Sequence, residues 1–220
     1  MRFIARNRGT VLAIATIWAA VGAAVTSTRL AAVALEPVAG APADNWLKGL
    51  QGKHKQLFDF PTPSGGIPLV HMMNYYDTYN QAYGVSDRDI DAVGTFYGST
   101  TFHAFNDAMW AKYQIGEFLK ENNASGEPAT ANPWRNAPVI LGMTLAPASI
   151  EALQKRGATF IVCNNALTIF SGLLAQARGL DAKLVYDDLR ANMLPGVELV
   201  PGMVVAIEQA QRAGLSYHRQ

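Results

Sequence analysis

Cysteine is almost absent from this 220-residue chain: Cys163 is the single thiol, so no disulfide can form within it. Charged residues are also few, at 16% of the sequence, whereas hydrophobic residues make up 50%. This composition excludes a largely disordered chain and predicts a domain that is stabilised by its hydrophobic core alone.

Motifs for nucleotides and metals are missing as well. No G-x-G-x-x-G or G-x-x-x-x-G-K-S/T segment occurs, so nothing in the sequence predicts a nucleotide cofactor. The four histidines form no H-x-x-x-H or H-E-x-x-H pair, and a single cysteine cannot build a thiolate zinc site. We therefore expect neither a cofactor nor a metal ion.

Basic residues are unevenly distributed along the chain. The first 34 residues hold four of the 18 basic residues and no acidic one, so the remaining 14 face 17 acidic residues, a net charge of −3. A domain of this charge lacks the Lys and Arg that neutralise phosphates, so we do not expect it to bind nucleic acid.

The N-terminal segment has the pattern of a secretory signal. Residues 1–8 form a basic head, and residues 9–25 are uncharged and rich in Ala, Val and Ile. Small-x-small cleavage sites occur at 20–22 and at 32–34, while the apolar run is also about long enough to remain as a membrane anchor. We expect residues 1–34 to be a signal peptide or anchor, residues 35–60 a linker, and the domain to be periplasmic or otherwise exported.

Residues 61–220 alternate between strand and helix patterns without an internal repeat. Apolar runs predict strands over 67–73, 90–96, 159–162, 197–200 and 215–217. Helical spacing predicts helices over 74–83, 100–113, 150–155, 166–177 and 202–213, and turn-forming residues predict an inserted loop over 122–138. This alternation predicts an α/β domain, with a mainly parallel sheet, helices on both faces and flavodoxin-like layering.

Residues that directly follow strands are candidates for binding, because ligands of parallel sheets bind beyond the carboxyl ends of the strands. The rule selects Asn74, Tyr97-Gly98, Cys163-Asn164 and the region of Pro201. We take Asn74, Gly98 and Asn164 as candidate substrate-binding residues.

Cys163 is the candidate catalytic residue. It stands between a predicted buried strand and the start of a predicted helix, where unpaired backbone N–H groups and the helix dipole favour a thiolate. The alternative is a small, unreactive cysteine that packs the end of the strand. Position alone does not choose between the two.

A second group of candidates follows the predicted strand 90–96. His103 can act as a general base or as the partner of a thiolate, since imidazole titrates near neutrality. Asn106 and Trp110 follow at helical spacing, so they are candidates for lining a shared pocket. The alternative is that His103 packs among aromatic side chains without a chemical role.

Two segments resemble the DsrE/DsrF-like family of small α/β sulfur-relay proteins: RGATFIVCNNAL at 156–167 and NMLPGVELVPGMVVAIEQAQRAGLSY at 192–217. The shared features are a strand that ends in Val-Cys, a PGV segment that leads to Val-Pro, and a closing Gln-x-x-Gly-x-x-Tyr pattern. The resemblance covers 149–217 well and 67–113 more loosely. It implies a doubly covered parallel sheet, a trimer or hexamer, and a cysteine that carries a persulfide.

Two functions are consistent with these patterns. In the first, the chain is an exported DsrE-like carrier that exchanges sulfur with an unidentified donor or acceptor protein through Cys163, and it is not a clear turnover enzyme. In the second, it is a non-catalytic binding or assembly module in which Cys163 is buried and structural. The reactivity of the thiol in the native protein distinguishes the two.

A reporter fused after Ala43 tests the export. Because a basic head precedes an apolar run, we expect the fusion to be active outside the cytoplasm. A matched fusion that lacks residues 1–34 is the control and should stay inside. Cytoplasmic activity of the full-length fusion would contradict the prediction.

Overall fold

The computed structural model describes residues 45–220. The predicted signal peptide or anchor, residues 1–34, therefore lies outside the described residues. Within 45–220, no helix combines the length and the apolar character needed to cross a membrane.

Five strands form the sheet at the centre of the domain, in the order β6-β5-β2-β1-β7. Every neighbouring pair is parallel, so the carboxyl ends of all five strands meet at one edge. The prediction of a mainly parallel sheet is confirmed. The strands are β1 (His54–Asp59), β2 (Ile90–Phe96), β5 (Thr159–Cys163), β6 (Val197–Val200) and β7 (Ser216–Arg219).

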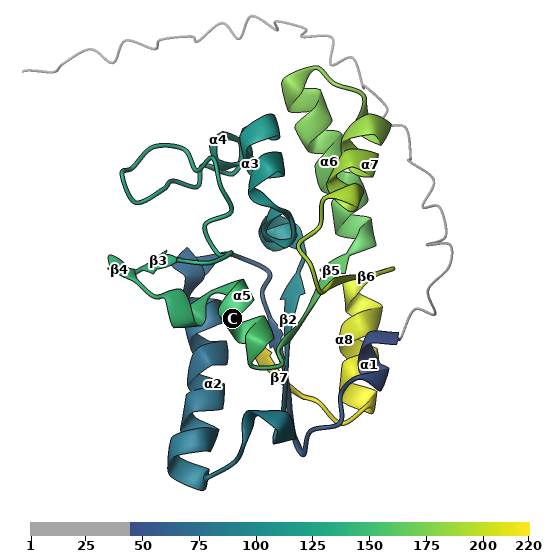
Figure 1. Cartoon of the computed structure of the whole chain (residues 1–220). Coiled ribbons are helices and arrows are strands. Elements are labelled where there is room, and N and C mark those ends of the chain that lie inside the picture. The colour runs from purple at the N-terminus through teal and green to yellow at the C-terminus, as the bar shows by residue number, and fades with distance from the viewer. Residues whose placement is uncertain (1–44) are drawn as a thin grey trace, which may run out of the picture. The chain divides into compact units, whose positions relative to one another are not determined.

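Helices lie on both sides of this sheet (Figure 1). On one side are α2 (Ile67–Tyr83) and α5 (Ile150–Lys155), and on the other are α8 (Met203–Arg212) and the short α1 (Asn45–Lys48). The remaining elements extend beyond the carboxyl edge or join the others: α3 (Asp107–Tyr113), α4 (Ile115–Leu119), the α6 (Asn164–Arg178) and α7 (Ala182–Ala191) hairpin, the β3 (Val139–Ile140) and β4 (Met143–Thr144) hairpin, and the 3₁₀ helices η1 (Ser64–Gly66), η2 (Asp87–Asp89), η3 (Gly98–Ala104) and η4 (Ala146–Ala148).

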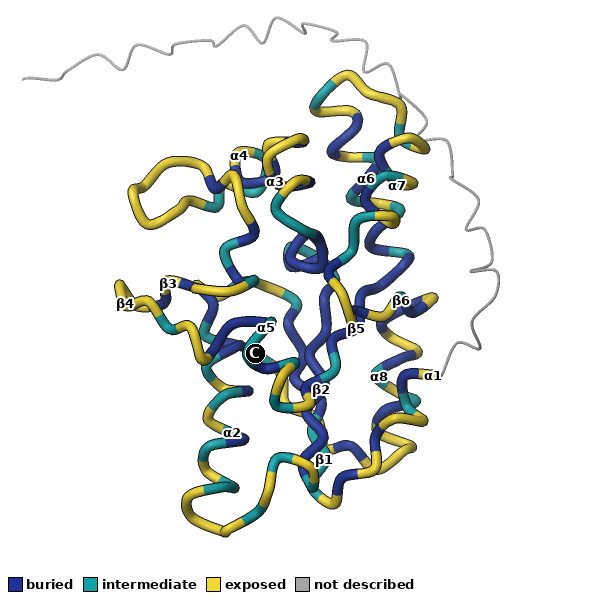
Figure 2. Tube along the Cα trace, viewed as in Figure 1, coloured by how far each residue is buried: buried dark blue, intermediate teal, exposed yellow. Residues whose placement is uncertain are grey.

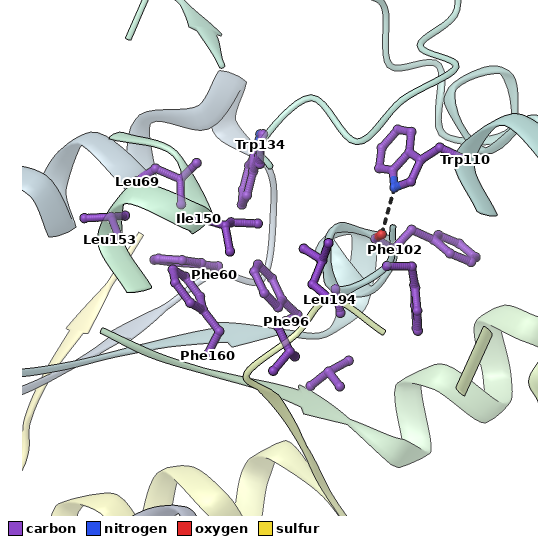
Figure 3. Packing of buried hydrophobic residues seen from close by; sticks show 14 of the residues in the cluster. Phe60, Leu69, Phe96, Phe102, Trp110, Trp134, Ile150, Leu153, Phe160 and Leu194 are labelled. Atoms are coloured by element: carbon purple, nitrogen blue, oxygen red, sulfur yellow. Dashed lines mark hydrogen bonds between the residues drawn. The ribbon is translucent and has the colours of Figure 1, made fainter. Parts of the chain in front are cut away.

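The alternation of side chains along the strands divides the core into two clusters, one on each face of the sheet. In β5, Phe160 and Val162 belong to the larger cluster, whereas Ile161 and Cys163 belong to the smaller one. The larger cluster includes residues of α2, α3 and α5, and the smaller one includes residues of α1 and α8. Figure 2 shows β2 and β5 as the buried centre of the sheet, and Figure 3 shows aromatic side chains of the larger cluster.

The strand predicted over 67–73 was wrong, because these residues form the first turns of α2. Pro68 lies in the first turn of this helix, where a missing N–H leaves no hydrogen bond unmade. The buried residues of α2 recur at helical spacing: Pro68, Leu69, Met72 and Tyr76. The apolar run is therefore one face of a helix, and Asn74 lies in the middle of α2 instead of after a strand.

The segment 35–60, predicted as a linker, contains α1 and β1, so the folded domain begins before residue 61. β1 pairs with β2 on one side and with β7 on the other. Its first three residues, His54 to Gln56, are polar and half-buried, and only its last three are buried. A search for apolar runs misses a strand that begins in this way.

The helix predicted over 100–113 is interrupted. Residues 98–104 form η3, Phe105 is extended, and Asn106 caps α3 by accepting a hydrogen bond from Met109 N at 3.2 Å. The loop predicted over 122–138 is confirmed, since no helix or strand lies within it.

Candidate functional site

Cys163 ends β5 and is the N-cap residue of α6. Its backbone is extended, with φ −77° and ψ 120°, so the chain passes directly from strand to helix at this residue. The sulfur Sγ accepts a hydrogen bond from Ala166 N at 3.4 Å, in the first turn of α6. The predicted place of the cysteine at a helix N-terminus is confirmed.

The N-terminus of a second helix also lies beside this sulfur. Met203 N, the first residue of α8, donates to Sγ at 3.3 Å. Gly202, just before it, lies beside the Asn165 side chain in the first turn of α6. Two helix N-termini therefore meet at one sulfur atom, and both of their dipoles stabilise negative charge there.

The surroundings of Cys163 are otherwise apolar. The residue is 5% exposed and lies in the smaller cluster together with Ala166, Val200 and Met203. Within the described part of the chain, the hydrogen-bond partners of Sγ are the two backbone N–H groups. Both groups donate, so Sγ acts here as a hydrogen-bond acceptor.

Hydroxyl groups from neighbouring strands gather around a buried carboxylate at the same edge and on the same face of the sheet. Asp59, at the end of β1, is 2% exposed and accepts hydrogen bonds from Thr95 Oγ1 at 3.2 Å and from Tyr217 OH at 2.5 Å. Burial, and then the Asp59 carboxylate, raise the pKa of both Tyr97 and Tyr217 above the ordinary value, so both phenols stay protonated.

His103 lies in a different environment. It is fully buried, its Nε2 lies 3.1 Å from Glu121 Oε1, and its ring packs on Trp134 with centroids 4.0 Å apart and on Trp110 at 5.3 Å. Both tryptophans belong to the larger cluster, whereas Cys163 belongs to the smaller one. The hypothesis of a Cys163–His103 pair is therefore not supported: each side chain has other partners.

The other candidates have separate structural contacts. Trp110 is fully buried and donates from Nε1 to Phe102 O at 3.0 Å, as Figure 3 shows. Asn106 caps α3 and donates to Asn192 Oδ1 at 3.2 Å, and the Asn164 side chain accepts from Tyr186 OH at 2.6 Å. Asn74 is exposed on α2.

Gly98 follows β2 with φ 58° and lies against Pro61, where a Cβ would be 3.0 Å from the carbonyl oxygen. A glycine is needed here for the backbone conformation. The structure thus distributes the seven candidate residues over several places and does not bring them into one site.

The positions of some residues at the carboxyl edge could be predicted from the sequence, and those of others could not. The strand-end rule selected Tyr97 and the region of Pro201, but it did not identify Met203 as a partner of Cys163. Asp59 was missed because its strand was taken for a linker. Among residues 45–220, no group of three or more His, Cys, Asp or Glu side chains is arranged to hold a metal ion.

Comparisons with known proteins do not assign the chain to a family. No protein-family model matches the chain, and no curated protein matches it. A solved structure of a protein of unknown function from Methanobacterium thermoautotrophicum is similar, with 16% sequence identity and a TM-score of 0.36, over 76% of this chain and 99% of that chain. A likeness at this TM-score carries no argument about the site.

Replacement of His103 tests whether it acts on the thiol. We expect His103→Gln to lower the free energy of unfolding by about 1–3 kcal/mol, because a buried imidazole loses its contacts with Glu121 and Trp134. The alkylation rate of Cys163 in the folded variant should equal that of the parent protein. A tenfold slower alkylation without unfolding, roughly 1.4 kcal/mol in the barrier, would restore His103 as a partner of the cysteine.

Proposed function

We propose that the protein is a sulfur carrier in which Cys163 holds a persulfide, within a DsrE-like fold. The observation that supports it is the pair of hydrogen bonds to Sγ, from Ala166 N of α6 and from Met203 N of α8. Two helix N-termini directed at one sulfur place partial positive charge beside it, which supports a role in which this sulfur carries negative charge.

Loading needs a donor that contains sulfane sulfur, such as a polysulfide. The Cys163 thiolate attacks the outer sulfur of the donor, and a new S–S bond forms as the S–S bond of the donor breaks. The electron pair of the broken bond leaves with the rest of the donor as a thiolate or sulfite. The sulfur remains on the protein as a persulfide anion, and attack by an acceptor thiolate reverses the step.

A carrier fits the site better than a turnover enzyme. The two hydrogen-bond partners of Sγ are backbone N–H groups, which stabilise an anion but transfer no proton. His103, the candidate general base, is bound to Glu121. In this proposal the chain supplies the two N–H groups that stabilise an anionic sulfur, and the donor and the acceptor supply the groups that exchange the sulfur.

A non-catalytic binding or assembly module is the second candidate. The low exposure of Cys163, at 5%, favours it, since a cysteine that caps a helix can be structural. The two functions differ in one property: a structural cysteine reacts only when the protein opens, and a carrier cysteine reacts in the folded protein.

Export and assembly belong to the same proposal. Export rests on the pattern of residues 1–34, with the domain periplasmic and the membrane involved only through that segment. A trimer or hexamer is implied by the family resemblance. Exposed apolar side chains on the α6–α7 hairpin support association of this kind: Ile169, Leu173, Leu180 and Leu184.

A matched pair of variants tests the hydrogen bond from Met203 N to Cys163 Sγ. Met203→Pro removes the N–H that donates to Sγ, at a helix position where proline is tolerated and after a Gly202 whose extended backbone suits it. Met203→Ala loses the same buried side chain and keeps the N–H. We expect persulfide loading by polysulfide to be about tenfold slower in Met203→Pro than in Met203→Ala, because a hydrogen bond to a charged sulfur is lost.

Intact-mass spectrometry of the folded proteins measures the loading, and Cys163→Ser is the control that should gain no sulfur. Circular dichroism should show that all three variants remain folded. Equal loading rates for the two Met203 variants would contradict the role of α8. Loading that occurs only after denaturation would favour the binding-module function.

A further inference from the structure

The β3–β4 hairpin ends in an apolar side chain at a strained backbone position. Leu141 and Gly142 form its two-residue loop, and both have positive φ, 52° and 76°. Loops of this kind favour Asn and Gly, because a bulky side chain is strained at positive φ. Leu141 is nevertheless 79% exposed, and Val139 and Met143 beside it are exposed as well. Packing within the described residues therefore does not explain a leucine at the tip.

The hairpin is attached firmly to the domain and carries no charge. Ile140 is buried, and a Cβ at Gly66 would lie 2.9 Å from its Cγ1, so the two pack tightly. The sequence has no charged residue between Arg135 and Glu151. Figures 1 and 2 show the hairpin projecting from the body of the domain with an exposed tip. It thus presents Leu141 as a fixed, uncharged projection.

The outer face of α6 is also uncharged. No charged residue occurs from Asn164 to Ala177, although the solvent face of a helix is usually polar or charged. Ile169 and Leu173 are exposed one turn apart on this face, and Gly172 lies on it too. A Cβ at Gly172 would have nothing within 4 Å, so packing within the described residues requires no glycine there. Glycine also destabilises a helix interior, so this residue has a cost that the single chain does not explain.

The two surfaces fit each other better than either fits itself. They lie on different sides of the domain (Figure 1), so they do not cover each other within one chain. An isologous contact between two copies would cover one surface and leave the other exposed, whereas a heterologous contact covers both. A projecting leucine also matches a helix face on which a glycine leaves a depression beside two apolar side chains. Neither surface has charged side chains that a contact would have to desolvate.

We propose that the β3–β4 hairpin docks on α6 of a second copy of this chain, with Leu141 inserted beside Gly172. Each copy then offers a hairpin to one neighbour and an α6 face to another, so the contacts close into a ring. The strain at Leu141 and the helix glycine are costs to the single chain that the contact offsets. This inference deepens the assembly part of the proposed function and rests on it, but it assumes nothing about Cys163.

Two variants that should not harm folding test the contact. Leu141→Asn removes the apolar tip and suits positive φ, so the chain should melt at the same temperature or higher while its assembly is lost. Gly172→Leu makes the α6 face more apolar and is a better helix former, yet it fills the depression and should also weaken assembly. Sedimentation equilibrium measures the dissociation constant, which we expect to rise roughly tenfold or more in each variant. Val204→Gln, at an exposed position of α8, is the control and should assemble like the parent.

Mixing the two variants tests whether the contact is heterologous. Leu141→Asn keeps the α6 face and Gly172→Leu keeps the hairpin, so together they can form one contact. We expect a 1:1 dimer that grows no further, from two proteins that are each monomeric alone. Because one contact lacks the avidity of a ring, the mixture is measured at about ten times the concentration at which the parent assembles.

Four results would overturn the inference: a monomeric parent, parent-like assembly of Leu141→Asn, tighter assembly of Gly172→Leu, or a mixture without the dimer. A monomeric parent that binds lipid vesicles through Leu141 would assign the hairpin to a membrane surface instead. Sulfur loading is measured separately on monomeric Leu141→Asn. Loading there leaves the carrier function intact whatever the assembly, and its absence in assembled parent protein would count against the carrier alone.

Discussion

Two hydrogen bonds to one sulfur atom connect the fold with the proposed chemistry. Cys163 Sγ accepts from the first turn of α6 and from the first residue of α8, so the sulfur joins two elements that are distant in the chain. α6 begins directly after β5, α8 begins a short turn after β6, and β5 and β6 are adjacent. The parallel sheet thereby brings two helix N-termini to the same point, and the dipoles of both favour an anion there.

The two faces of the sheet differ in composition. The larger cluster holds most of the aromatic residues, including the tryptophans around His103. The smaller cluster has fewer residues, and Cys163 and Tyr97 lie where this face meets the carboxyl edge. Alternation along each strand decides which residue belongs to which face, and therefore which residues can act together.

The sequence predicted those elements whose residues carry an uninterrupted pattern. β2 has the predicted bounds, and all seven of its residues are buried. β1 was missed because its first half is polar, and the start of α2 was misread because an apolar run fits a helix face as well as a strand. α7 was not predicted either, although Asp181 caps it.

The candidate site could be predicted only in part, because one of its hydrogen-bond donors is local in the sequence and the other is distant. The local sequence locates Cys163 at the start of α6, since strand and helix are contiguous there. The second donor, Met203 N, comes from a segment 40 residues further along, and only the strand order brings it to the sulfur. The supposed pairing with His103 failed because sequence distance from a strand end does not say which face a side chain occupies.

A sulfur carrier needs a thiol that reacts while the protein is folded, and Cys163 is only 5% exposed. The most direct measurement is the alkylation rate of Cys163 over a series of low denaturant concentrations, well below the unfolding transition. For a carrier we expect a rate that is independent of denaturant, because the reaction needs no global opening. A rate that rises exponentially with denaturant, with the slope of global unfolding, would show that the thiol reacts only in the unfolded chain and would contradict it.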